Sequence, residues 1–357
     1  MSRPPTPDTE RPTEEVLDSA SAQLSITDLG DSEHFQLLVR AINRTLSTEV
    51  AEITYAQIID GLPIADVAWD SRSQPHNGHP ILDNTHEELC PGMLDKARGF
   101  RREFRPEILS FDAQLLHGYR ACAPGSRGFK TRLVEMVAVA VHQIAAILFE
   151  LDTSVHKNDG ITEWAPPKSD DRYWKWHPDG PLPTLFSHTW YVEHGQYPRQ
   201  VADMVGYWAE ARILGGVVLF DRRQPDAEPR ADRDAIYFHS DRQDVTYRIY
   251  QLLPEQRNAL LDFLLADELP STCPLPILGD RNNRIRVDPE EPIRTTGIYR
   301  DLWERNGIPP GVGDVRLRDV WDKTEFPTLD DYSASRHRAL DRKERIELEK
   351  AWASDAE

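Results

Sequence analysis

The chain has 357 residues, 39% of them hydrophobic, which is enough for one large domain or two smaller ones around a buried core. Its formal net charge of -18 would repel a phosphate backbone or an anionic lipid surface, so we expect no nucleic-acid and no membrane partner. Cys90, Cys122 and Cys273 are far apart and form no CxxC pair, so the sequence indicates neither a disulfide framework nor a thiolate zinc site. A reducing, cytoplasmic compartment is expected.

Residues 1–30 are rich in Pro, Thr, Glu, Asp and Ser and cannot bury enough apolar surface to order themselves. We expect a disordered tail there and a helical region over residues 31–158. That region begins with two short helices, the second with Ser47 as its N-cap and Gly61 just after its end. A further helix is expected directly after Pro106, because proline is tolerated in a first helical turn.

The longest apolar run, residues 133–151, approaches the roughly 20 residues that a membrane-spanning helix needs. Its polar residues, Glu135, His142, Gln143 and Glu150, form one narrow stripe, as on a central helix of a soluble core. His142 is the sharpest single candidate, because a buried polar group without a partner costs about 1–3 kcal/mol. Glu135 is expected to orient it. A satisfied core histidine is the alternative to a catalytic one.

Residues 159–185 hold many prolines, glycines and aromatic residues and allow little regular structure. A free linker has no reason to carry so many large rings, so we expect a loop packed on the second half of the chain. A linker between two halves is the alternative. His76 and His79, in an earlier loop, could clamp a metal, but no further ligand is near them in the sequence.

Residues 186–325 are expected to form an α+β region. Pro198 suits the start of a helix, and the run of residues 216–221 is apolar on both faces, which predicts a strand buried on both sides. Residues 235–239 and 246–252 predict two further strands, joined by a polar turn into an antiparallel hairpin.

The whole pattern predicts an α+β fold, with a mainly helical first half and a small antiparallel sheet of three strands packed with helices in the second. The alternation of strand and helix that a Rossmann or TIM-barrel fold requires is absent from the sequence. Residues 326–357 are expected to form a charged C-terminal helix, supported by ion pairs one turn apart.

Asp203, Tyr207 and Glu210 recur at i, i+4 and i+7 on the helix after Pro198, so they share one helix face. Two carboxylates that flank a phenol can do acid-base chemistry or hold a divalent cation. The alternative is an ordinary solvated helix face.

His188, Glu193 and His194 lie just before that helix, and His239 lies on the second strand. Imidazoles with a carboxylate can bind a metal or act as a base and its orienting group. Their spacing matches neither the HExxH helix nor a zinc finger, so a divalent metal is an alternative that the sequence does not favour.

The functional hypothesis is a protein that binds or transforms a small molecule in a pocket between the aromatic-rich loop and the sheet. Its candidate catalytic residues are His142, His188, Glu193, His194, Asp203 and Glu210. Its candidate substrate-binding residues are Trp190, Tyr207, Trp208 and His239. Nucleotide cofactors are not expected, because no phosphate-binding glycine motif is present. The alternative is a non-catalytic protein interaction or scaffold protein, and whether the chain is an enzyme stays open.

Overall fold

The computed structural model describes residues 22–305 apart from 74, 84, 158, 224–231 and 269–271, together with a few residues between 328 and 341. Residues 1–21 of the expected tail and most of the expected C-terminal helix lie outside the described residues.

Helices and strands follow one another along the described residues without a repeating unit. The α-helices are α1 (Glu33–Leu46), α2 (Glu49–Asp60), α3 (Ala65–Trp69), α4 (Met93–Glu103), α5 (Ala113–Ala121), α6 (Arg127–Glu150), α7 (Asp171–Trp176), α8 (Val201–Ile213), α9 (Pro254–Leu265) and α10 (Ile293–Thr296). The strands are β1 (Gln23–Ser25), β2 (Ser110–Asp112), β3 (Val217–Asp221), β4 (Ile236–His239), β5 (Ile249–Gln251), β6 (Arg286–Val287) and β7 (Ile298–Tyr299).

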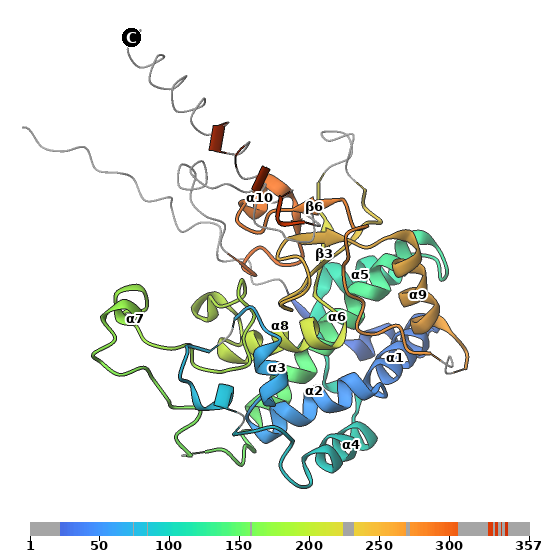
Figure 1. Cartoon of the computed structure of the whole chain (residues 1–357). Helices are drawn as coiled ribbons and strands as arrows, with labels where there is room; N and C mark the ends of the chain where they lie inside the picture. The colour runs from blue at the N-terminus through green and yellow to red at the C-terminus, as the bar shows by residue number, and fades with distance from the viewer. Residues whose placement is uncertain are drawn as a thin grey trace, which may run out of the picture.

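Helix α6 lies at the centre of the molecule and packs along α8, with α1, α2 and α5 around it (Figure 1). It is long and apolar enough to cross a membrane, but 72% of its most apolar window is buried inside the fold. It is therefore a buried core helix of the α+β fold, as its narrow polar stripe predicts.

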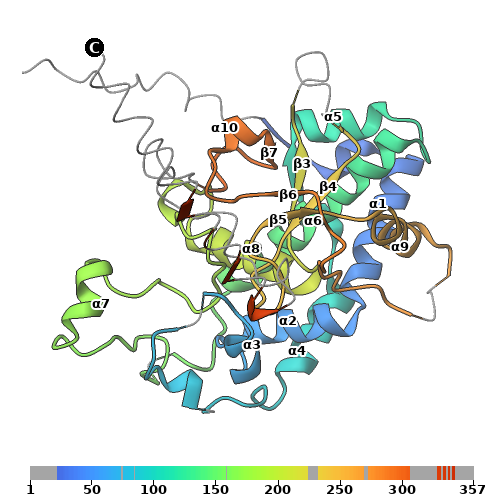
Figure 2. The ribbon, with the colours of Figure 1, turned by 45° about the horizontal axis from the view of Figure 1, so that its top comes forward.

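The main sheet has the order β6-β5-β4-β3-β7, and all its neighbours are antiparallel. The predicted meander of β3, β4 and β5 forms its middle, with Val218 opposite Phe238 and Phe238 opposite Tyr250. Every residue of β3 is buried, as predicted from a sequence that is apolar on both faces of the strand. The strand packs on α6 and α8. Figure 2 shows the sheet lying over these two helices. The α+β class is confirmed.

The prediction of a disordered tail is wrong for its last residues. Strand β1 pairs with β2, which lies far along the chain, and Ile26 just after β1 is fully buried. A strand of three residues has too little local pattern to be recognised without its partner.

Two predicted helix starts are also wrong by a few residues. The chain after Pro106 forms one 3-10 turn and then β2, and α5 begins only after Asp112, whose carboxylate accepts from the amide of Gln114 at 2.7 Å. The N-cap of α2 is Thr48, whose hydroxyl accepts from the amide of Ala51 at 3.3 Å, and Ser47 ends the previous helix. Gly61 ends α2 in the left-handed conformation, as predicted.

The aromatic-rich segment, residues 159–185, contains only the short helix α7 and extends as an arm from the body of the molecule (Figure 1). The described rings of its first part contact the helical region and not the sheet. Trp164 stacks on His76 with ring centroids 6.2 Å apart and meets His79 edge-on at 5.0 Å. The expectation that this segment packs on the second half is therefore wrong for Trp164.

Candidate functional site

His142 lies at the contact between α6 and α8 and is buried between two carboxylates. Its Nδ1 is 2.9 Å from Glu210 Oε1, and its Nε2 is 2.9 Å from Asp203 Oδ1. The second oxygen of Glu210 accepts from Arg300 Nη1 at 2.8 Å, and the second oxygen of Asp203 accepts from the amide of Arg199 at 2.7 Å. We call Asp203, His142, Glu210 and Arg300 the buried charge network.

The network balances two cations against two anions. Burial alone would lower the pKa of His142, but hydrogen bonds to Asp203 and Glu210 outweigh it and raise the pKa. Burial opposes the ionised form of Glu210, yet Arg300 and His142 bring its pKa below the usual value. The arrangement favours an imidazolium at His142, with both N–H groups donated to carboxylates.

Two expectations about these residues are corrected by the geometry. Glu135 does not orient His142, because its carboxylate pairs with Arg132 at 2.7 Å and with Arg222. The Asp203 and Glu210 face is not solvated, because α6 covers it and leaves Glu210 fully buried. The periodicity of the sequence predicts the polar stripe of α6 and the acidic face of α8, but it does not predict that these two faces pack against each other.

His188 and His239 are fully buried, and each uses both ring nitrogens. His188 Nε2 donates to the carbonyl of His239 at 3.1 Å, and its Nδ1 accepts from the amide of Trp190 at 3.2 Å. His239 Nε2 donates to the carbonyl of Tyr247 at 3.1 Å, and its Nδ1 accepts from Tyr191 at 3.2 Å. Burial lowers the pKa of both, so these are neutral imidazoles that support the backbone.

The remaining sequence candidates do not join the network. Glu193 is exposed, and His194 lies half-buried in a 3-10 helix, His194–Gln196. Trp208 is buried against Phe186, with ring centroids 4.7 Å apart. Trp190 is half-buried beside His239, and the ring of Tyr207 meets His142 edge-on at 4.6 Å.

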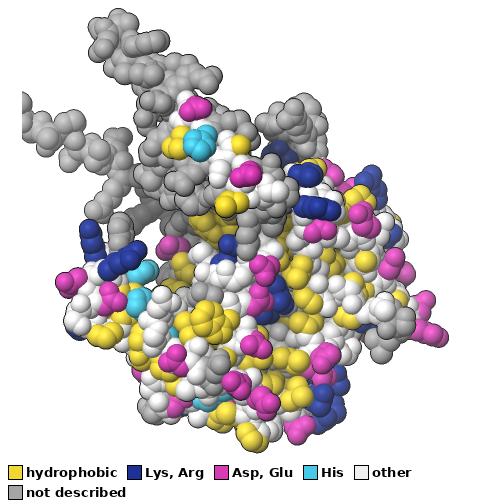
Figure 3. Space-filling model, viewed as in Figure 1, with side chains coloured by type: hydrophobic (Ala, Val, Ile, Leu, Met, Phe, Trp, Pro, Cys, Tyr) yellow, Lys and Arg dark blue, Asp and Glu magenta, His cyan; other side chains and the backbone are white. Residues whose placement is uncertain are grey.

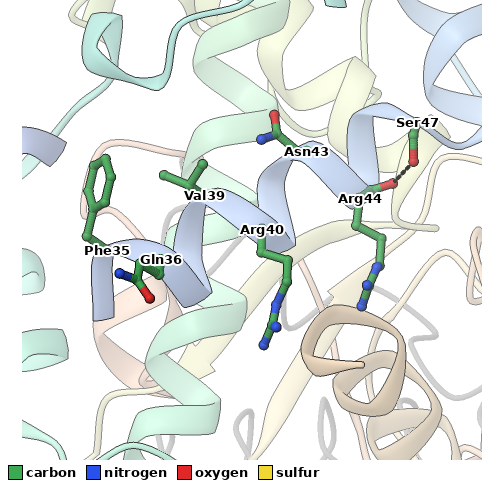
Figure 4. Close-up of a pocket in the computed structure, with 7 residues that line it drawn as sticks. All are labelled: Phe35, Gln36, Val39, Arg40, Asn43, Arg44 and Ser47. Carbon is green, nitrogen blue, oxygen red and sulfur yellow. Dashed lines mark hydrogen bonds between the residues drawn. The ribbon is translucent and has the colours of Figure 1, made fainter. Parts of the chain in front are cut away.

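Two surface hollows lie away from all of these candidates. Figure 4 shows one along α1, where Arg44 reaches the carbonyls of Phe263 and Ala266 at the end of α9. The other is a hollow beside residues 104–107. Over the face in Figure 3 the acidic side chains are scattered among basic and apolar ones.

A second cluster joins four side chains of metal-ligating type that are far apart in the sequence. Asp60 ends α2, His86 and Cys90 lie in the loop before α4, and His156 follows α6. One ligand atom from each lies within 4.8 Å of all the others. We call this set the four-ligand cluster.

The shortest separations in the cluster centre on Asp60 and His156. Asp60 Oδ2 is 3.2 Å from His86 Nε2, and its Oδ1 is 3.4 Å from His156 Nε2. Cys90 Sγ is also 3.4 Å from His156 Nε2. Asp60 is fully buried, yet among the described residues no donor makes a hydrogen bond to its Oδ1.

Both imidazoles of the cluster turn Nε2 inward because Nδ1 is held from outside. His86 Nδ1 donates to the carbonyl of Pro63 at 3.0 Å, and His156 Nδ1 is 2.6 Å from Asp159 Oδ2. A metal-bound histidine almost always has such a partner on its other nitrogen. The cluster therefore has the inner ligands and the outer hydrogen bonds of a metal site.

The sequence contains little local signal for this cluster. His86 and Cys90 are four residues apart, but Asp60 and His156 reach them only through the packing of α2 beside the chain after α6. His76 and His79, the loop histidines considered for a metal clamp, are not members of it.

Comparisons with protein-family models, curated proteins and solved structures found no match.

Proposed function

We propose that this chain binds one divalent transition-metal ion, Zn²⁺ above others, through Asp60, His86, Cys90 and His156. The observation that carries the proposal is the fully buried Asp60 oxygen that lacks a hydrogen-bond donor among the described residues and faces two imidazoles and a thiol. A buried carboxylate oxygen without a donor is costly, and a bound cation removes that cost.

The size of the cluster supports a tetrahedral ion. Zinc bonds of about 2.0–2.3 Å give a tetrahedron whose edges are roughly 3.3–3.8 Å long. The separations of 3.2 and 3.4 Å between Asp60 and the two imidazoles, and of 3.4 Å between Cys90 and His156, lie near that range. Small movements of the side chains would complete the coordination.

The ligand types select among metals. Thiolate and imidazole suit Zn²⁺, whereas Ca²⁺ and Mg²⁺ prefer sites built from oxygen ligands. One carboxylate and one thiolate also neutralise the charge of a divalent ion, so the buried site would carry no net charge. Binding would release the protons that the thiol and any protonated imidazole hold.

Four protein ligands leave no open coordination position, which is typical of structural rather than catalytic zinc. The ion would join the end of α2, the loop before α4 and the chain after α6. At roughly a thousandfold excess of metal over the dissociation constant, such binding would stabilise the fold by about 4 kcal/mol.

The test begins with metal analysis of protein purified without chelator. About one zinc ion per chain is expected, and Co²⁺ should replace it with a tetrahedral visible spectrum and a thiolate charge-transfer band. A chelator should remove the metal and lower the melting temperature.

Cys90→Ser should abolish the thiolate band, and Cys122→Ser is the matched control because Cys122 is also a half-buried free cysteine. The proposal fails if Cys90→Ser and Cys122→Ser retain the same metal content and the same Co²⁺ spectrum.

A cytoplasmic location stays part of the proposal. The three cysteines of the chain are free, and a reducing compartment would keep Cys90 as a thiol that can bind metal.

Small-molecule binding beside the sheet is a second candidate function, and one ion pair favours a small anion as its ligand. Arg212 Nη2 and Arg242 Nη1 both donate to Asp70 Oδ2, at 3.2 and 2.7 Å, so two cations share one carboxylate. Burial, and then repulsion from Arg242, lowers the pKa of Arg212 to about 10. The Asp70 carboxylate is one-third exposed, so the group reaches the surface.

If this group binds anions, phosphate or citrate should raise the melting temperature of the wild type more than that of Arg242→Gln. Arg102→Gln, an exposed charge on α4, is the control. An equal response of the two variants would remove this candidate. The hypothesis of a non-catalytic interaction protein stays a prediction.

A further inference from the structure

We propose that Asp159 is the positioning residue of the metal site and couples metal binding to the start of the aromatic-rich segment. This inference rests on the proposed function, because it concerns a residue that would act through the ligand His156.

The first step concerns the imidazole of His156. Asp159 Oδ2 is 2.6 Å from His156 Nδ1, so the carboxylate holds the proton on Nδ1 and leaves the lone pair of Nε2 facing Asp60 and Cys90. A carboxylate that accepts a hydrogen bond from a ligating imidazole fixes the orientation of its ring and supports metal binding.

The second step concerns the chain that follows. The other oxygen of Asp159 accepts from the amide of Ile161 at 2.8 Å. Ile161 packs on a small apolar cluster that includes Leu62 and Ile81, and Trp164 donates its amide to the Ile161 carbonyl at 3.3 Å. One carboxylate therefore connects the ligand His156 with the first residues of the aromatic-rich segment.

Coupling of this kind acts in both directions. A metal that fixes His156 would also fix Asp159 and the amide of Ile161, and an ordered Ile161 would favour the ligating orientation of His156. The backbone carbonyl of Pro63 holds the other imidazole, His86, and no side-chain substitution can remove it. Asp159 is therefore the outer group that a mutation can test.

The experiment compares Asp159→Asn with Asp152→Asn in the full chain. Both changes remove one negative charge from the chain that follows α6, but Asp152 pairs with Lys157 at 2.6 Å and is not a partner of His156. Zinc affinity is measured by competition with a chromophoric chelator. Asp159→Asn should bind zinc about 10–100-fold more weakly than Asp152→Asn, with the stoichiometry unchanged.

Two further readouts separate positioning from a general loss of structure. The Co²⁺ spectrum of Asp159→Asn should change, while its metal-free melting temperature matches that of Asp152→Asn. Zinc should slow hydrogen exchange at the Ile161 amide in the wild type and less in Asp159→Asn. Asp159→Glu, which keeps the carboxylate, should recover part of the affinity.

Equal zinc affinity in Asp159→Asn and Asp152→Asn would overturn the inference while the metal site itself stands. A wild-type chain that binds no zinc would instead remove the proposed function.

Discussion

Ser154 Oγ lies 1.8 Å from the place where a β-carbon on Gly61 would be. Gly61 is the left-handed end of α2, with a φ of 104°. The same hydroxyl donates to the carbonyl of Asp60 at 3.1 Å and accepts from the amide of His156 at 3.1 Å. The absence of a side chain at residue 61 thus lets two ligands of the four-ligand cluster come together.

Gly61→Ala should therefore weaken metal binding as well as the fold. The left-handed conformation costs a non-glycine residue about 1–2 kcal/mol, and the new methyl group must also displace the chain that carries Ser154 and His156. We expect zinc affinity to fall on the order of tenfold, as about 1.4 kcal/mol of lost binding energy would produce.

Gly125→Ala is the control for the cost of the left-handed backbone alone. Gly125 has a φ of 80°, but no atom lies within 4 Å of an added β-carbon. Zinc titration and urea unfolding of both variants give the comparison. Similar zinc affinities in the two would mean that contact with Ser154 does not shape the site.

Gly206→Ala should destabilise the buried charge network. A β-carbon on Gly206 would lie 2.4 Å from the His142 ring, which is held on both sides by carboxylates and cannot move without losing them. Overpacking of this kind costs about 1–3 kcal/mol. Urea unfolding measures the loss.

The matched control is Gly99→Ala in α4, where the nearest atom to an added β-carbon is 3.8 Å away. There the better helix propensity of alanine should stabilise the protein by up to about 1 kcal/mol. A Gly206→Ala protein as stable as Gly99→Ala would show that the ring can shift at no cost.

The elements that the sequence predicts best are those with a long local pattern. Helix α6 can be recognised from the narrow polar stripe on its otherwise apolar surface, and strands β3 to β5 from their short runs of β-branched and aromatic residues bounded by polar turns. The pairing of β1 with β2 could not be predicted, because each has three residues.

The candidate residues follow the same rule. His142 is identifiable as a lone polar residue on an apolar helix, and Asp203 and Glu210 as a pair on one face of another. The contact of His142 with the two carboxylates depends on the packing of α6 on α8, which cannot be predicted from the periodicity of either helix. The four-ligand cluster is harder still, since its members come from three separate segments.

His142→Gln should cost the most stability in acid. The folded pKa of His142 is above its unfolded value of 6.5, so the stabilisation is fully present below pH 6.5 and is lost as the pH rises through the folded pKa. Removal of one member of a buried charged group costs about 3–5 kcal/mol, because the partner carboxylates stay buried.

The check is urea unfolding of wild type and His142→Gln over a pH series. The difference in unfolding free energy should shrink as the pH rises. Asp203 and Glu210 contribute to stability in the opposite direction of pH. Their folded pKa values are lowered, so their contribution to the free energy of unfolding is lost as the pH falls through those values. His117→Gln, at an exposed position on α5, is the control for replacing a histidine outside the network.

His239 should behave in the opposite way to His142. Burial holds its folded pKa well below 6.5, so the unfolded chain takes up a proton that the folded chain refuses, and stability falls as the pH drops below 6.5. Nitrogen NMR of the imidazoles distinguishes the two states directly. His239 should carry one proton, on the Nε2 that donates to Tyr247, whereas His142 should carry protons on both nitrogens because a carboxylate faces each. A neutral His142 at pH 6.5 would contradict the charge balance of the buried network, and a doubly protonated His239 would mean that its hydrogen bond from Tyr191 is not made.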